Sequence, residues 1–241
     1  MVPIGTGSGE SKLRTPMAFP PVRISYKTYE FETCDIHVRS LRDAQQFADP
    51  RSRAADLGIY SATWPLFGVV WNSSQILARL MVHHKIEDKR ILEVGCGLGL
   101  ASLVLNHRNA DITATDHHPE AEDFLKANIE LNKGEKFPFV RADWEDVAND
   151  QLGRFDLIIG SDLLYEQNHA DLLSQFIERH SKPECEVVIV DPGRGYAAKF
   201  NKKMSALGYS QTQTTVEDPS SLNRPFKGRI MRYQVLTSLL G

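Results

Sequence analysis

Short apolar segments alternate with longer amphipathic segments from residue 90 to the C-terminus. The apolar segments predict strands at 90–94, 112–115, 137–140, 155–160, 186–190, 209–215 and 229–236. The amphipathic segments predict helices at 99–106, 119–131, 169–180 and 196–207, and Gly208 ends the last of them. Strands that alternate with helices in this way predict an α/β fold: a Rossmann-like, seven-stranded, mostly parallel sheet with helices on both faces.

The chain before residue 90 has a different pattern. Partial alternation over 24–41 predicts a small β-hairpin, and the polar segment 42–56 predicts a loop with a short helix. Apolar residues then recur at helical spacing over 76–81, which predicts an amphipathic helix ending near His83. We therefore expect three parts: a disordered tail at 1–21, a hairpin and loop extension at 22–60, and the α/β domain at 61–241.

The composition is that of an ordinary soluble protein, and 241 residues suit one α/β domain with an appendage. A net charge of −3 lacks the basic excess that binds a phosphate backbone, which counts against nucleic acid as the main substrate. Cys34, Cys96 and Cys185 are widely separated, which argues against a disulfide framework or a zinc site and favours the reducing cytoplasm. We expect neither a signal peptide nor a membrane span, because polar residues interrupt the apolar stretch 64–82.

A glycine-rich loop follows the first strand of the α/β domain, in the segment Glu93-Val-Gly-Cys-Gly-Leu-Gly99. Ligands bind outside the carboxyl ends of parallel strands, and glycines let the backbone approach a bulky ligand without a Cβ in the way. The dinucleotide fingerprint GxGxxG fails, because Leu100 stands where its third glycine belongs. A glycine-rich turn without function is the other alternative. Glu93 does not suit a pyrophosphate, but it suits the cationic end of S-adenosylmethionine (SAM), through water or a backbone contact.

An acidic residue, Asp116, ends the second predicted strand of the domain. At this position a carboxylate can accept hydrogen bonds from both hydroxyls of a ribose, although an acid at a strand end is often only a turn former. His117 and His118 follow directly, and the pair is typical of a solvated turn. The loop and Asp116 together favour SAM as the ligand.

Three further segments follow the same order along the chain: Gly68-Val-Val-Trp71, Ala142-Asp143-Trp144 and Ser161-Asp-Leu-Leu-Tyr165. With the glycine loop, Asp116 and the N-terminal hairpin, they resemble the class I SAM-dependent methyltransferases. Within that class they are similar to the methyltransferase-16 family, the METTL21-like protein lysine methyltransferases. The resemblance extends over most of the chain, from about residue 36 to residue 236.

The resemblance implies a role for each segment. Trp71 would border the cofactor, unless it is a core tryptophan at a helix start or Trp64 takes that role. Asp143 would bind the adenine amino group, and Trp144 would line the adenine pocket, unless Trp144 is a surface-loop residue. The expected cofactor-binding residues are Trp71, Glu93, Gly95, Gly97, Gly99, Asp116, His117, Asp143, Trp144 and Ser161.

The methyl acceptor depends on the segment Asp162-Leu-Leu-Tyr165, which resembles a family motif at the place where methyl group and acceptor meet. Asp162 would orient the amine and Tyr165 would form a wall of its channel, unless Asp162 is only a helix N-cap. The Asn/Asp-Pro-Pro-Tyr signature of many DNA, RNA and glutamine methyltransferases is absent. The loop 191–196 matches no lysine methyltransferase subgroup.

The expected function is therefore that of a SAM-dependent methyltransferase acting on a lysine of a protein substrate, with S-adenosyl-L-homocysteine as product and no metal. A small-molecule N- or O-methyltransferase and a non-catalytic SAM-binding module on the same fold are the alternatives.

Overall fold

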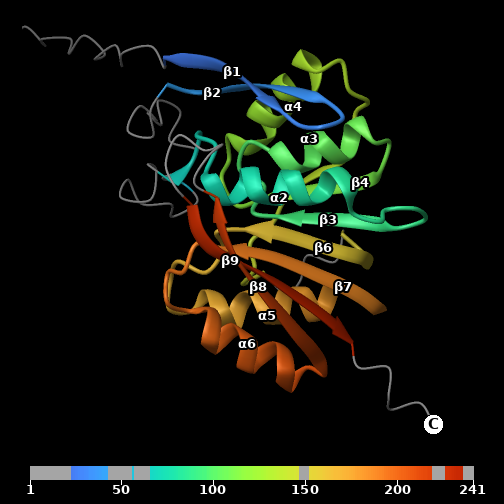
Figure 1. Ribbon diagram of the computed structural model, residues 1–241, viewed down its shortest axis with the longest axis vertical. Coiled ribbons are helices and arrows are strands. Elements are labelled where there is room, and N and C mark those ends of the chain that lie inside the picture. The colour runs from blue at the N-terminus through green and yellow to red at the C-terminus, as the bar shows by residue number, and fades with distance from the viewer. Residues whose placement is uncertain (1–22, 43–55, 57–65, 147–151, 219–225, 236–241) are drawn as a thin grey trace, which may run out of the picture.

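The computed structural model describes residues 23–42, 56, 66–146, 152–218 and 226–235 (Figure 1). The expected tail at 1–21, most of the loop at 42–56 and Trp64 lie outside the described residues. The helices are α2 (Asn72–His83), α3 (Leu100–His107), α4 (Ala121–Leu131), α5 (His169–His180) and α6 (Ala197–Ala206). None of the described helices is long and apolar enough to cross a membrane.

The strands form two sheets. The predicted hairpin is a two-stranded antiparallel sheet of β1 (Ile24–Glu30) and β2 (Asp35–Leu41). The large sheet contains β3 (Arg90–Val94), β4 (Asp111–Asp116), β5 (Phe139–Arg141), β6 (Phe155–Ser161), β7 (Ser181–Asp191), β8 (Tyr209–Asp218) and β9 (Phe226–Val235). Each strand and helix predicted within the described residues is confirmed, but β7 begins at Ser181 rather than at residue 186. Its polar first residues resemble a loop in sequence, yet Ser181 pairs with Phe155 ahead of an irregularity in the register.

The strand order of the large sheet is β5-β4-β3-β6-β7-β9-β8. The first five strands in this order, from β5 to β7, run parallel to one another, and β9 is antiparallel to both β7 and β8. The chain therefore moves outward from β3 to β5 and returns on the other side of β3 as β6. Ligands of open parallel sheets bind at this kind of switch point, beyond the carboxyl end of the strands.

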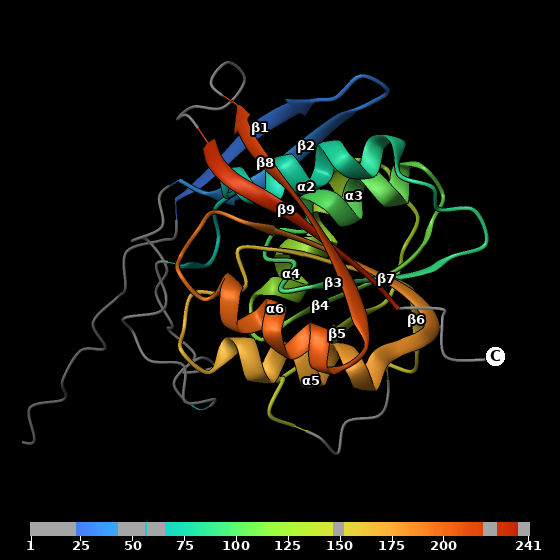
Figure 2. The ribbon, with the colours of Figure 1, turned by 60° about the horizontal axis from the view of Figure 1, so that its bottom comes forward.

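The sheet lies between two groups of helices, with α2, α3 and α4 on one face and α5 and α6 on the other (Figures 1 and 2). Alternation along β7 shows why both faces are apolar. Val188 and Val190 belong to the core under α2 and α3, whereas Val187 and Ile189 belong to the core under α5 and α6. All four side chains are fully buried, as a strand covered on both faces requires.

The hairpin is attached to the domain through α4. Asn128 and Asn132, one helical turn apart, accept hydrogen bonds from the backbone N–H groups of Arg39 (2.7 Å) and His37 (2.8 Å) in β2. The side-chain amide of Asn132 also donates to the His37 carbonyl (2.7 Å). Two helix side chains thus satisfy backbone groups of a strand that the other strand of the hairpin does not reach.

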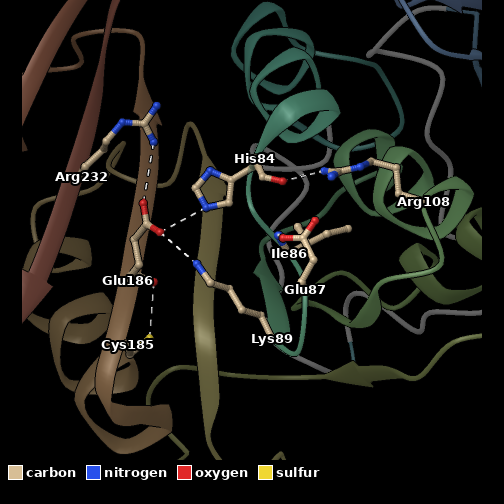
Figure 3. Close-up of polar contacts among 8 residues, drawn as sticks. All are labelled: His84, Ile86, Glu87, Lys89, Arg108, Cys185, Glu186 and Arg232. Atoms are coloured by element: carbon tan, nitrogen blue, oxygen red, sulfur yellow. Dashed lines mark hydrogen bonds and ion pairs between the residues drawn. The ribbon is translucent and has the colours of Figure 1, made fainter.

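A cluster of charged residues joins the end of α2 to the large sheet, at the edge opposite to the carboxyl ends of its parallel strands (Figure 3). Glu186 near the start of the paired part of β7 lies 3.1 Å from His84 Nε2, 3.4 Å from Lys89 Nζ and 3.9 Å from Arg232. The hydrogen bond from His84, supported by the charge of Lys89, lowers the pKa of Glu186 below its ordinary value. This cluster is far along β7 from Asp191, where the strand ends, so it supports the fold rather than the site.

Candidate active site

The glycine loop connects β3 to α3 and has the left-handed backbone that glycine permits. The φ angles of Gly95, Gly97 and Gly99 are 61°, 56° and 76°. A Cβ at Gly95 would approach a Leu163 methyl group to 2.5 Å, whereas a Cβ at Gly97 would meet no atom within 4 Å. The loop therefore packs against the protein at Gly95 and is open at Gly97, which fits close approach of a ligand to the backbone.

Asp116 lies beside this loop, as its place at the end of β4 predicted. One carboxylate oxygen accepts a hydrogen bond from the Gly97 N–H (2.7 Å), and the other accepts one from the His118 N–H (2.8 Å). Burial raises the pKa of Asp116, and the two N–H donors oppose that shift. Each oxygen keeps a further lone pair with which it can accept a ligand hydroxyl.

Glu93 is buried behind the loop. Its carboxylate accepts hydrogen bonds from the backbone N–H (2.8 Å) and the hydroxyl of Ser102 in the first turn of α3. Burial raises the pKa of Glu93 to about 7, against the lowering effect of the Ser102 hydrogen bonds. In this arrangement the carboxylate fastens the start of α3 to β3; a contact with the cationic end of SAM stays a prediction.

The two histidines after Asp116 have different surroundings. His117 is exposed, and its Nδ1 lies 3.9 Å from a carboxylate oxygen of Asp143 beyond the end of β5. The expectation of a solvated turn is wrong for His118, which is 7% exposed. Its ring stacks on Phe67 with centroids 3.9 Å apart, because the apolar face of an imidazole packs well against a phenyl ring.

Asp143 and Trp144 follow β5 at the next strand end. Asp143 accepts a hydrogen bond from the Glu145 N–H (2.9 Å) and keeps its side chain about half exposed. Trp144 is half-buried, with its indole 5.3 Å from the His169 ring and 6.5 Å from the Phe176 ring, both in α5. Trp144 therefore packs against α5 from a loop, and its place at the adenine stays a prediction.

Ser161, an expected cofactor-binding residue, ends β6, and the candidate acceptor residues Asp162 and Tyr165 follow it. No helix begins at Asp162, since α5 starts only at His169, so the N-cap alternative is wrong. The Asp162 carboxylate instead forms a two-pronged ion pair with Arg194, with Nε–Oδ1 and Nη2–Oδ2 distances of 2.5 and 2.8 Å. Arg194 follows β7 in the loop to which sequence reasoning assigned no role, and the flanking glycines of Pro-Gly-Arg-Gly were its only signal.

Tyr165 stands at the edge of this segment, 40% exposed, with its ring edge-on to His169 at 4.4 Å. Partial burial raises the pKa of Tyr165 to about 12, and the negative charge of Asp116 adds to the effect. The phenol therefore stays neutral at physiological pH. His169 bonds through Nδ1 to the Leu163 carbonyl (2.8 Å), which holds the segment against α5. Sequence reasoning missed His169, which contacts both Tyr165 and Trp144.

Trp71 completes this side of the site. Its indole N–H donates to the Leu66 carbonyl (3.0 Å), and its ring lies 6.0 Å from the Arg194 guanidinium. The residue is 37% exposed, so the core-tryptophan alternative is wrong. Arg194 thus contacts both Trp71, at the start of α2, and Asp162, just after the end of β6.

An open groove of about 680 Å³ extends from Tyr165. It is lined by Glu166, Asn168 and Asp171 on one side and by Tyr196 and Lys199 on the other. Aromatic rings, carboxylates and a lysine therefore line a shallow surface groove next to Tyr165.

Known proteins resemble the chain in sequence and in fold. An electron transfer flavoprotein beta subunit lysine methyltransferase of Mus musculus is 31% identical over 144 residues, covering 58% of this chain and 54% of that protein. Protein N-lysine methyltransferase METTL21A of Danio rerio is 30% identical over 139 residues, covering 54% of this chain and 63% of that protein. The chain spans about half the length of the first of these relatives.

Among solved structures, the SAM-bound magnesium protoporphyrin IX methyltransferase ChlM of Synechocystis PCC 6803 has a TM-score of 0.53 at 18% identity. The likeness covers 68% of this chain and 78% of that one, and it concerns the fold. A family model described as "Lysine methyltransferase" matches residues 63–205, which is more than half of the chain and includes the glycine loop, Asp116 and Asp162. The chain therefore belongs to the lysine methyltransferase family.

Proposed function

We propose that the chain is a SAM-dependent methyltransferase that modifies a lysine side chain of a protein. The observation that carries the proposal is the juxtaposition of two strand-end sites. The glycine loop with Asp116, at the end of β4, forms one of them, and Asp162 with Tyr165, beyond the end of β6, forms the other. Because β6 pairs with β3, the carboxyl ends of these strands bring a nucleoside site and an acceptor site together.

The residues present fit SAM. The open backbone at Gly97 would receive it, the carboxylate of Asp116 would accept from its ribose hydroxyls, and Asp143 and Trp144 would hold its adenine. SAM, when bound, supplies a methyl group on a sulfonium centre. The protein's own task is to hold the acceptor in line with that group, since alignment accounts for much of the rate of such a displacement.

The acceptor amine must be neutral to act as nucleophile. A free lysine has a pKa near 10.4, so deprotonation at neutral pH costs about 3 to 4 pKa units. Desolvation next to Tyr165 and Trp71 favours the neutral amine, and the carboxylate of Asp162 can accept one of its N–H bonds and thereby aim the lone pair. Tyr165 offers an aromatic face to the approaching cation.

A protein acceptor is supported by two observations. The relatives named above act, by their names, on lysines of proteins. The shallow groove beside Tyr165 is lined mostly by polar side chains, which a peptide segment next to an acceptor lysine could contact. The three cysteines, all free, support our proposal of a cytoplasmic location, which stays untested.

Two experiments test the function. Titration calorimetry with SAM should show binding, and Asp116→Ala should abolish it because the acceptor of the ribose hydroxyls is removed; an unsubstituted protein that binds no SAM contradicts the cofactor assignment. Tritiated SAM with a heat-treated cell lysate should then label discrete protein bands whose label survives on lysine after acid hydrolysis. Label only in the small-molecule fraction would favour a small-molecule methyltransferase, and SAM binding without any transfer would favour a binding module.

A further inference from the structure

The contact between Arg194 and Asp162 is the most specific polar interaction at the acceptor end of the site. Both guanidinium bonds are short, and the Asp162 side chain is only 11% exposed. Paired bonds of this kind fix the plane of a carboxylate as well as its position. They use one lone pair on each oxygen and leave the other free for a further donor.

The backbone around the pair is shaped to make it. Asp162 has a φ of 56°, which is uncommon for a residue other than glycine, and its N–H donates to the Val190 carbonyl (2.9 Å). Gly193 and Gly195 flank Arg194 with φ angles of 89° and 100°. Two loops from neighbouring strands β6 and β7 therefore both adopt left-handed turns where the two side chains meet.

The pair lies among further acids. Asp191, at the end of β7, is 1% exposed, and within the described residues its Oδ1 has no hydrogen-bond partner. Its other oxygen accepts from the Gly193 N–H (3.1 Å) and lies 3.5 Å from Arg229 Nε in β9. Burial, together with the negative charge of Asp162, raises the pKa of Asp191.

The remaining charged neighbours lie around Tyr165. The carboxylates of Asp116, Glu166 and Asp162 each act on the pKa of its phenol, and Arg194 opposes them. Arg194 is thus the cation that balances Asp162 on the side of the site that faces Tyr165 and Trp71.

We infer that Arg194 is a positioning residue for the methyl acceptor: it aims the carboxylate of Asp162 and cancels its charge, so that a lysine binds there as the neutral amine. The inference rests on the proposed function. A bare carboxylate beside the acceptor would stabilise the ammonium form and raise the pKa of the lysine, which slows transfer. A carboxylate already paired with Arg194 accepts the amine N–H without that penalty.

The same geometry suggests an opposite role that the test must separate. Arg194 is a cation bound to the Asp162 carboxylate near the rings of Trp71 and Tyr165, and glycines flank it in the chain. It could therefore occupy the position that an acceptor lysine would take. If it had to leave before an acceptor enters, its removal would raise activity.

The experiment compares Arg194→Gln with Arg194→Lys. Initial rates of tritium transfer from SAM to heat-treated lysate protein are measured from pH 6 to pH 10. Arg194→Gln should shift the alkaline midpoint of the rate profile upward by about one pH unit and lower the rate at pH 7 about tenfold. Arg194→Lys keeps the charge but not the two-pronged geometry, so it should recover most of the midpoint and only part of the rate. SAM binding by calorimetry should stay within about twofold in both variants.

Two controls make the result specific. Arg232→Gln removes an arginine from the Glu186 cluster at the other end of the sheet and should leave the pH profile unchanged. In the Asp162→Asn background, Arg194→Gln should cause no further shift, because the two residues act as a pair. A faster rate at pH 7 in Arg194→Gln, or an unshifted midpoint, would overturn the inference while leaving the proposed function intact. An unsubstituted protein that binds SAM but labels no protein would overturn both.

Discussion

At the scale of single residues, the glycines of the cofactor loop have distinct tasks. Gly95 lies against Leu163 and belongs to the packing of the domain, whereas Gly97 faces open space beside Asp116. Both have positive φ, so an alanine costs about 1 to 2 kcal/mol of backbone strain at either position. What differs is where the added methyl group points.

We predict that Gly97→Ala weakens SAM binding at least tenfold, because its methyl group occupies the space where a ligand approaches. Its loss of unfolding free energy should be no larger than the backbone strain of about 1 to 2 kcal/mol. Gly95→Ala is the matched variant, and it should lose more stability because its methyl group collides with Leu163. Calorimetry with SAM and urea unfolding measure the two effects. Equal stability losses in the two variants would contradict this division of tasks.

Glu93 is a buried acid whose pKa is raised to about 7 from 4.5. The native state therefore holds this proton more tightly than the unfolded state. Its contribution to stability is fully present below about pH 4.5 and is lost as the pH rises to about 7, by on the order of 3 kcal/mol.

Glu93→Gln should remove this part of the pH dependence while keeping a hydrogen-bonding side chain next to Ser102. The measurement is the free energy of unfolding in urea from pH 4.5 to pH 7.5. The exposed Glu130→Gln on α4 serves as control and should keep the slope of the unsubstituted protein. A Glu93→Gln variant with that same slope would show that the Glu93 carboxyl does not titrate in this window.

At the scale of elements, α4 connects the hairpin to the cofactor loop. Asn128 accepts from the Arg39 N–H in β2 and donates from its own amide to the Leu98 carbonyl in the glycine loop (3.3 Å). Within the described residues, the Asn132 side chain bonds to His37 in β2 and to the Asn128 carbonyl, and not to the glycine loop. One asparagine thus serves two elements and the other serves only the hairpin.

We expect Asn128→Ala to weaken both the hairpin and SAM binding, and Asn132→Ala to weaken the hairpin alone. Each loses a buried or half-buried set of hydrogen bonds, which costs about 1 to 3 kcal/mol. Amide hydrogen exchange at residues 37 and 39 reports on the hairpin, and calorimetry reports on the ligand. Unchanged SAM affinity in Asn128→Ala would show that the Leu98 contact does not support the loop.

At the scale of the whole molecule, the Glu186 cluster and the candidate site lie at opposite ends of one sheet. The cluster joins the end of α2 to β7 and β9 (Figure 3), whereas the candidate site lies beyond the carboxyl ends of the parallel strands. Because the folded pKa of Glu186 is lowered, its contribution is present above pH 4.5 and is lost as the pH falls through the folded value.

Glu186→Gln should therefore lower the free energy of unfolding at pH 7 by about 1 to 3 kcal/mol, as expected for a hydrogen bond to a charged group. The difference from the unsubstituted protein should shrink as the pH falls below 4.5. SAM affinity, measured at a temperature where both proteins are folded, should be the same. A variant that binds SAM more weakly would mean that the two ends of the sheet are coupled.

The sequence predicts the sheet, its helices and the grouping of the glycines with Asp116, because apolar periodicity determines strands and parallel strand ends meet at one edge. It does not predict which side chains meet across loops. Arg194 and Asp162 are 32 residues apart, and Asn128 and Arg39 are 89 apart, so no local pattern joins them. The expectation that His118 lies in a solvated turn is wrong for the same reason, since its burial depends on Phe67 from another part of the chain.

The strand order also places the residues expected to bind SAM and the residues proposed to bind the methyl acceptor mostly on different loops. Apart from Trp71 and Ser161, the residues expected to hold SAM lie at or after the ends of β3, β4 and β5, whereas the residues proposed for the acceptor follow β6 and β7. A graft that exchanges 162–167 and 191–196 together would therefore change the proposed acceptor residues and leave the loops after β3, β4 and β5 untouched. If the proposed function holds, such a graft should redirect methylation to another acceptor, provided that the Asp162–Arg194 pair is transferred as a unit.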